Sequence, residues 1–289
     1  MAEALGHRFG QIVGEVLETA IQPVLQAFAK KYDLYLDKKG YRRCRTGRKC
    51  AWVDHNGNSH DLDFVLERGG SSDKHGIPTA FIETAWRRYT KHSRNKAQEI
   101  QGAIEPLAET FRHARPFKGA VLAGVFTDGA LTQLRSLGFS VLHFPYSNIV
   151  AAFQRFGIDA AFDENTPDSE FERKVQAFER LSPDDRARLS EELVRTHETE
   201  VKEFVTALES AVMRQVQTVI ILALHGKAHE VKSIQEAIKF IDSYEDVDSK
   251  PVERYEIQVR YNNGDTIEGR FKDKASAIEF LTGFIPPAR

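Results

Sequence analysis

Two acidic residues lie within apolar segments of the sequence, Asp63 in HDLDFVL and Glu83 in AFIETAW. A carboxylate in an apolar strand is costly to desolvate unless a cation neutralises it, and a divalent metal ion is one such cation. Directly after Glu83, residues 87–96 (RRYTKHSRNK) contain five Lys or Arg and no acid. Carboxylates for a metal beside cations for phosphate indicate metal-dependent hydrolysis of phosphodiester bonds.

This chemistry requires a particular set of ligands. Phosphodiester hydrolysis is slow without a catalyst, and one or two Mg²⁺ ions accelerate it when at least two carboxylates hold them beside the phosphate. We expect Asp63 and Glu83 to be these ligands if their segments pair as neighbouring strands. Asp61 shares a face with Asp63 by the two-residue period of a strand and is the alternative ligand. Asp63 is favoured because it directly precedes the apolar run FVL.

Positive charge is concentrated in the first half of the chain. Residues 1–150 hold 21 Lys and Arg against 15 Asp and Glu, and residues 151–289 hold 19 against 27, so +6 and −8 sum to the net charge of −2. Residues 38–49 form a second window, with seven cations and no acid. An alternative for this window is a solvated hairpin whose charges discourage aggregation. The two windows predict phosphate contacts by Arg42, Arg43, Arg45, Arg48, Lys49, Arg87, Arg88, Lys91, His92 and Arg94.

The apolar periodicity predicts an α+β fold in which a mixed β-sheet is flanked by helices. A long helix is expected over residues 5–32, with Pro23 either kinking or dividing it, and a second over about 90–113 with a buried apolar stripe. A short helix is expected over residues 128–137. Strands are expected near residues 40–46, 50–55, 60–67, 79–86, 119–126 and 139–144.

The composition predicts three parts of the chain. Residues 1–157 form the core with both acids, residues 158–214 an acidic helical segment, and residues 215–289 a C-terminal module. Within that module the order strand, turn, strand, helix occurs twice, around residues 218–241 and 256–281. Two such units predict a four-stranded sheet covered by two helices on one face.

The two acids and the order of elements resemble the PD-(D/E)xK nuclease superfamily, which includes many type II restriction endonucleases. The resemblance covers roughly residues 9–145: an aspartate begins an apolar strand, a Glu-x-x ends the next strand, and a cationic helix follows. It implies a Mg²⁺-dependent endonuclease that acts on double-stranded DNA. A homodimer is expected, because two identical active sites most simply cut both strands of a symmetric site.

One departure from the family pattern concerns its lysine. The family places a lysine two residues after its glutamate, where it positions the attacking water and stabilises charge, but this chain has Ala85 there. The resemblance implies a substitute from the following helix, Lys96 or, as a second choice, Lys91. The alternative is that the lysine is absent, which leaves metal-only hydrolysis or an inactive nuclease fold that binds DNA. The family's third acid, from the first helix, corresponds to Glu15 or Glu18.

Several other classes of function are disfavoured. Gly69 and Gly70 are not followed by the lysine of a phosphate-binding loop, so no nucleotide cofactor is expected. Cys44 and Cys50 are too few for a structural zinc site and are expected to be reduced thiols. No apolar run approaches the roughly 20 residues that span a bilayer, and the first residues lack a signal-peptide pattern. We therefore expect a cytoplasmic protein without a membrane partner.

Overall fold

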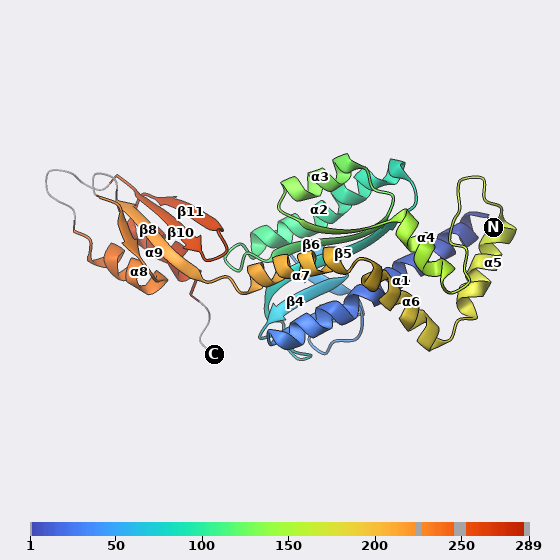
Figure 1. Cartoon of the computed structure of the whole chain (residues 1–289). Helices are drawn as coiled ribbons and strands as arrows, with labels where there is room; N and C mark the ends of the chain where they lie inside the picture. Colours follow the sequence, from blue (N-terminus) through green and yellow to red (C-terminus); the bar gives the residue numbers. More distant parts are fainter. Residues whose placement is uncertain (1, 224–226, 246–252, 286–289) are drawn as a thin grey trace. The chain divides into compact units, whose positions relative to one another are not determined.

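The computed structural model describes residues 2–223, 227–245 and 253–285, which form two compact units, Met1–Glu209 and Ser210–Arg289 (Figure 1). The first unit contains a five-stranded sheet in the order β1-β4-β5-β6-β7. The strands are β1 (Leu34–Lys38), β4 (Phe64–Arg68), β5 (Ile77–Arg87), β6 (Phe117–Gly124) and β7 (Ser140–Pro145). Neighbours pair antiparallel from β1 to β5 and parallel from β5 to β7, so the sheet is mixed, as predicted.

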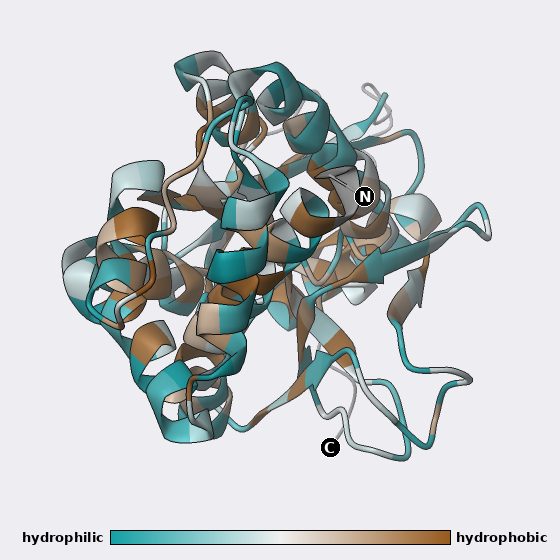
Figure 2. Ribbon diagram, turned by 90° about the vertical axis from the view of Figure 1, so that its right-hand side faces the viewer, coloured by the Kyte–Doolittle hydropathy of each residue, from teal (hydrophilic) through white to brown (hydrophobic). Residues whose placement is uncertain are grey.

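Helices cover both faces of this sheet. Figure 1 shows α2 (Ser93–Thr110) and α3 (Asp128–Ser136) over one face and α1 (Ala2–Lys31), which contacts β1 and β5, over the other. Pro23 lies inside α1 without dividing it. The helices carry polar and apolar residues on different sides, as the alternation of teal and brown in Figure 2 shows. The predicted mixed sheet flanked by helices is thus confirmed.

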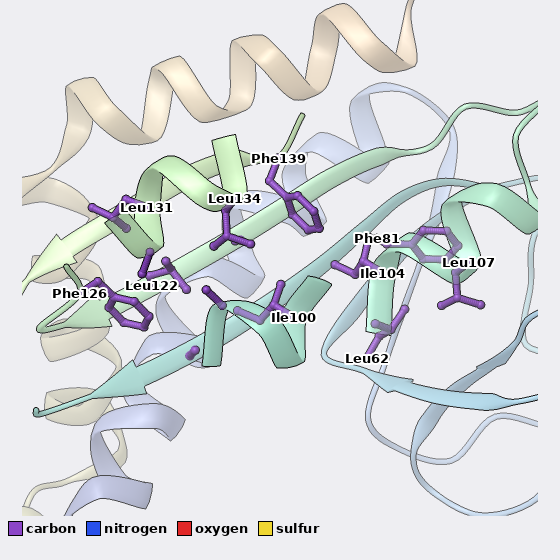
Figure 3. Packing of buried hydrophobic residues seen from close by; sticks show 14 of the residues in the cluster. Leu62, Phe81, Ile100, Ile104, Leu107, Leu122, Phe126, Leu131, Leu134 and Phe139 are labelled. Atoms are coloured by element: carbon purple, nitrogen blue, oxygen red, sulfur yellow. The ribbon is translucent and has the colours of Figure 1, made fainter. Parts of the chain in front are cut away.

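The apolar stripe of α2 anchors this helix on the sheet. Ile100, Ile104 and Leu107 are buried at successive helical turns and pack with Phe81 of β5 and Leu122 of β6 (Figure 3). Each fully buried side chain of this size contributes roughly 1.5–3 kcal/mol. The position of α2 over β5 is therefore fixed by its core contacts, independently of its polar residues.

The remaining helices of the first unit continue this packing. α4 (Tyr146–Gln154) contacts β6 and β7, while α5 (Asp168–Glu179) and α6 (Pro183–Thr196) pack on α1. α7 (Glu198–Val212) follows, and its Glu209 accepts a hydrogen bond from Lys31 of α1 at 3.2 Å. No helix among the described residues is long and apolar enough to cross a membrane.

Two expected strands near the site differ from the structure. Residues 40–46, expected as a strand, form a loop, and the strand is β1, one segment earlier. The expected strand 60–67 is broken at Asp63, where the chain bends. Its first half, β3 (Ser59–Leu62), pairs with β2 (Cys50–Val53) in a separate two-stranded sheet, and its second half is β4.

The second unit contains the duplicated module. Each copy has two strands and a helix: β8 (Val216–Ala223), β9 (His229–Val231) and α8 (Ile234–Ser243), then β10 (Tyr255–Tyr261), β11 (Thr266–Phe271) and α9 (Lys274–Thr282). The four strands form one antiparallel sheet in the order β11-β10-β8-β9. Both helices bury side chains in one core with alternate residues of β8 and β10, which places them on the same face of the sheet.

Gly124 allows β6 to end directly against β5. It has a φ of +96°, and a Cβ there would lie 2.1 Å from the carbonyl oxygen of Arg87. We expect Gly124→Ala to lower the free energy of unfolding by about 2 kcal/mol or more. Gly102→Ala is the matched control, because Gly102 is exposed on α2 with no atom within 4 Å of its Cβ position, and it should stabilise by about 0.5–1 kcal/mol. Urea unfolding measures both; a Gly124→Ala variant as stable as the parent contradicts the expectation.

Candidate active site

The register of β4 and β5 brings Asp63 beside Glu83. Phe64 pairs with Ile82, so extending this antiparallel register by one residue sets Asp63 opposite Glu83. The Asp63 Oδ2 accepts hydrogen bonds from the backbone N–H and the hydroxyl of Thr84, both at 2.7 Å. These bonds hold the Asp63 carboxylate against β5 at the bend of the chain.

Glu83 is a buried carboxylate that is incompletely satisfied. Its residue is 8% exposed, and its Oε1 has no hydrogen-bond partner among the described residues. Burial and then the negative charge of Asp63 raise the pKa of Glu83 to about 8, while the charge of Lys96 and a hydrogen bond from the Asp63 backbone oppose this rise. A buried anion with a free oxygen is unfavourable unless a further cation binds it.

Glu18 of α1 is the third acid of this group. Burial raises its pKa, and the negative charge of Asp63 adds to the rise, so the two carboxylates lie within electrostatic reach of each other. The charge of Glu18 also raises the pKa of Glu83. Both glutamates lie on the exposed side of α1, but the other candidate, Glu15, pairs with Arg8 at 3.3 Å. The structure therefore brings Glu18, and not Glu15, to Asp63 and Glu83.

Lys96 belongs to α2, the helix that packs on the face of β5 that carries Glu83. Glu83 and Ala85 share a face of the strand by the two-residue period. Ala85 is buried in one cluster with Ala97 of α2, which places this helix over that face. Lys96 directly precedes Ala97, its side chain is 19% exposed, and its charge lowers the Glu83 pKa. A small residue at position 85 thus leaves room for α2, whose Lys96 is near enough for its charge to act on Glu83.

Glu99 and Lys91 have other partners. Lys96 Nζ lies 3.3 Å from Glu99 Oε2, and Arg87 Nη2 lies 3.7 Å from the same oxygen, so Glu99 joins these two cations. Lys91 lies in the short 3₁₀ helix Thr90–His92, is 62% exposed and pairs with Glu164 at 2.8 Å. Of the two candidate lysines, Lys96 acts electrostatically on Glu83, whereas Lys91 forms a surface ion pair with Glu164.

Asp61 does not belong to the group. The chain bends at Asp63, so Asp61 lies on β3, in the two-stranded sheet, and the shared face expected for one continuous strand does not exist. Its carboxylate is 46% exposed and lies 2.5 Å from Lys49 Nζ. Asp61 is therefore placed as a surface partner of Lys49, which corrects its expected role as an alternative metal ligand.

Arg42 and Arg45 were expected to contact phosphate, but their side chains are buried in ion pairs. Arg42 is 1% exposed, and its guanidinium contacts Glu67 at 2.5 and 3.0 Å and Asp37 at 2.7 Å. Arg45 is almost as buried and contacts Asp37 at 2.5 Å. Phosphate contact by these two side chains is excluded by their burial, because they neutralise acids on β1 and β4. The sequence window showed the cations, but not the acids that turn them inward.

The other predicted phosphate contacts fall into two classes. Arg88 is held within the protein: its guanidinium lies 4.0 Å from the centre of the Tyr146 ring, and its Nε donates to the Phe162 carbonyl at 2.7 Å. Arg87 is half-buried and donates to the Trp86 carbonyl at 2.8 Å. The exposed members are Arg43, Arg48, Lys49, Lys91, His92 and Arg94.

A second set of possible metal ligands was not anticipated from the sequence. Among the described residues, Asp37, Glu67 and His75 have ligand atoms within 4.8 Å of one another. Both carboxylates already face guanidinium groups, so a metal ion there would have to displace Arg42 and compete with Arg45. Asp37 directly follows Leu36 in β1, and Glu67 directly follows the apolar run of residues 64–66 in β4; an acid inside each of these strands was the signal that could have found them. We interpret the set as an ion-pair cluster.

The carboxylates of Asp63, Glu83 and Glu18 suit a metal ion that binds only one or two of them directly. These three carboxylates are not gathered within the 4.8 Å that the Asp37 set satisfies, so they form a wider group. Mg²⁺ keeps several waters and commonly takes only one or two carboxylates directly. Asp63 and the free oxygen of Glu83 suit such binding, with Glu18 as a more distant acid.

The ion-pair cluster predicts a large effect on stability. We expect Arg42→Leu to lower the free energy of unfolding by about 3–5 kcal/mol, because it leaves buried Asp37 and Glu67 without their main counter-ion. Arg43→Leu, at the exposed neighbouring position, should change it by about 0.5 kcal/mol or less. Chemical denaturation compares the two, and similar effects would contradict the assigned role of Arg42.

Glu83 predicts a pH-dependent stability in the presence of a chelator. Its pKa is raised from 4.5 to about 8 in the folded protein, so the folded state retains a proton that the unfolded chain has released. The parent should therefore lose stability as the pH rises from 4.5 to about 8, by an amount on the order of a few kcal/mol. Glu83→Gln should remove this loss, and Glu15→Gln, at an exposed carboxylate, should retain it. If the free energy of unfolding changes with pH in the same way for the parent and Glu83→Gln, the raised pKa was assigned to the wrong residue.

Comparisons with known proteins leave the family of this chain unassigned. No family model matches the chain, and no curated protein matches it in sequence. Among solved structures, the protein of unknown function AF1548 aligns at 9% identity with a TM-score of 0.28, over 67% of this chain and 96% of that chain. A TM-score this low supports no conclusion on fold or function.

Proposed function

We propose that this chain is a Mg²⁺-dependent endonuclease that hydrolyses phosphodiester bonds of double-stranded DNA, as a site-specific type II restriction enzyme does. The observation that carries the proposal is the free, buried Oε1 of Glu83 beside Asp63, with Lys96 approaching from α2. Two neighbouring acids with a lysine on the adjacent helix are residue types that suit this reaction. Action as a homodimer in the cytoplasm belongs to the same proposal.

Each residue of the group has a separate task in this mechanism. Asp63 and Glu83 would hold the ion, and Thr84 fixes the orientation of the Asp63 carboxylate through two hydrogen bonds. Bound Mg²⁺ would activate water and neutralise charge on the phosphate. Lys96 stabilises the negative charge that develops on the phosphate oxygens and positions the attacking water. Glu18 adds negative charge that strengthens the attraction of a cation.

The alternative, an inactive nuclease fold that only binds DNA, accounts less well for Glu83. A purely structural carboxylate at this burial would be expected to have a complete set of hydrogen bonds or a salt bridge. Asp37 and Glu67 of the same sheet have such partners, whereas Glu83 has a free oxygen among the described residues. This contrast favours a site that is completed by a cation from solution.

Cleavage of plasmid DNA tests the proposal. Purified protein with Mg²⁺ should convert supercoiled plasmid into discrete fragments, and Glu83→Ala should abolish cleavage while DNA affinity measured in chelator stays nearly unchanged. Binding without cleavage by the parent would support the inactive fold. Cleavage by Glu83→Ala at the parent rate would show that Glu83 was assigned wrongly.

Two matched pairs of variants sharpen this test. Lys96→Ala should lower the cleavage rate by about 10²–10³-fold, as the loss of one charge-stabilising group does, and Lys91→Ala should leave it unchanged. Glu18→Gln should reduce the rate more than Glu15→Gln. Equal effects within either pair would contradict the placement of these residues.

A further inference from the structure

The loop between β1 and β2, residues 39–49, exposes an aromatic ring among cations. Tyr41 is 81% exposed, more than any other large hydrophobic residue in the described part of the chain, where Val53 and Met213 follow at 55% and 44%. An exposed Tyr on a mobile loop would need no explanation. This loop is, however, tightly held by buried side chains.

Anchors lie on both sides of Tyr41. Arg42 donates from Nε to the Ser71 carbonyl at 3.0 Å and from Nη2 to the Lys74 carbonyl at 2.8 Å, in addition to its contacts with Glu67. On the other side, the Gly40 carbonyl accepts a bond from Arg45 at 3.1 Å. The loop is thereby joined to β4 and to the β4–β5 connection, and Tyr41 is presented outward on a fixed backbone.

The loop is also closed on itself. The Gly40 backbone N–H donates to the Arg48 carbonyl at 2.7 Å, and the Cys44 N–H donates to the Ser72 carbonyl at 3.1 Å. Fixing the backbone before a ligand arrives reduces the conformational entropy lost on binding. A rigid loop with an exposed ring is therefore suited to recognition.

The charges of the loop separate into an inner and an outer set. Inside, Arg42 and Arg45 balance Asp37 and Glu67, so the buried cluster has no net charge. Outside, Arg43 and Lys49 pair with the surface acids Asp73 and Asp61. Lys39 and Arg48 are exposed and, within the described residues, form no ion pair, so their charge is available to an anionic partner.

The loop begins close to the candidate active site. Lys38 pairs with Phe64 in the β1–β4 register, and Phe64 directly follows Asp63. The charge of Lys39 partly opposes the rise in the pKa of Glu18 that burial and Asp63 cause. Lys39 and the carboxylate group therefore lie at the same end of the sheet, within reach of one extended ligand.

We propose that residues 39–49 form a nucleic-acid contact surface on which Tyr41 stacks on an unpaired base while Lys39 and Arg48 contact the neighbouring phosphates. A ring among cations fits a polymer that offers flat bases and a charged backbone together. Bases within a regular duplex are already stacked on one another, so the ring selects DNA that has an unpaired nucleotide. The inference deepens the proposed function and rests on it, because Tyr41 would hold a nucleotide of the double-stranded substrate that becomes unpaired where the duplex opens near the scissile bond.

Fluorescence anisotropy with two labelled probes tests this inference, both measured in chelator without metal. One probe is a blunt duplex and the other is the same duplex with a short single-stranded overhang. The parent protein should bind the overhang probe more tightly. Tyr41→Ala should weaken its binding by about 5- to 150-fold, the effect of losing one stacked base, with little change for the blunt duplex. Tyr41→Phe, which keeps the ring, should bind as the parent does.

Control variants separate stacking from charge and from folding. Val53→Ala, at another exposed apolar residue, should leave both affinities unchanged. Lys39→Ala and Arg48→Ala should weaken both probes and reduce the salt dependence of binding. A parent that shows no preference for the overhang, or a preference that Tyr41→Ala retains, overturns the inference. So does binding to vesicles of anionic lipid that depends on Tyr41 while binding to DNA does not.

The inference and the proposed function can fail separately. Glu83→Gln should keep the overhang preference, because Tyr41 is outside the carboxylate group. A Tyr41-dependent preference without any cleavage by the parent would leave the contact surface in place and remove the nuclease. Cleavage of plasmid by a protein that has no such preference would support the nuclease and remove the contact surface.

Discussion

Burial of carboxylates in one sheet is the constraint on which the first unit depends. Asp37, Glu67 and Glu83 are all nearly inaccessible to solvent, and each must be neutralised or remain protonated. The chain neutralises Asp37 and Glu67 with Arg42 and Arg45. For Glu83 it supplies the nearby charge of Lys96 and one backbone bond, and leaves an oxygen free. Two solutions to the same physical problem in one sheet distinguish a structural cluster from a candidate site.

The packing of α2 connects the core to this candidate site. The stripe of Ile100, Ile104 and Leu107 sets the rotation of the helix about its axis, because these residues must face β5 and β6. Once that rotation is set, Lys96 lies near enough to β5 for its charge to act on Glu83. A side chain larger than Ala at position 85 would occupy the space between strand and helix.

Local periodicity was sufficient to predict much of the fold. The buried stripe of α2, the mixed sheet and the repeated strand, strand, helix order of the second unit all follow from patterns within a few turns of chain. The inward direction of Arg42 does not, because its partner Glu67 lies 25 residues away and is recognised only after β1 and β4 have paired. The choice between Glu15 and Glu18 likewise depends on the rotation of α1 against the sheet. The bend at Asp63, which separates it from Asp61, falls within a stretch whose local pattern is that of one continuous strand.

The cationic window of residues 38–49 shows why charge composition alone is a poor guide to an interface. Its most buried cations stabilise the fold, and its exposed ones surround a ring that the charge pattern does not reveal. Removal of Arg42 would disturb the loop and the sheet together, so weaker DNA binding by such a variant could not separate contact from folding. Tyr41 lies between residues held by the contacts of Arg42 and Arg45 but makes none of these contacts itself, so its truncation leaves the buried ion pairs intact. A change in DNA binding caused by substitution of Tyr41 therefore reports on contact between the loop surface and DNA. A change caused by substitution of Arg42 also reports on the folding of the loop.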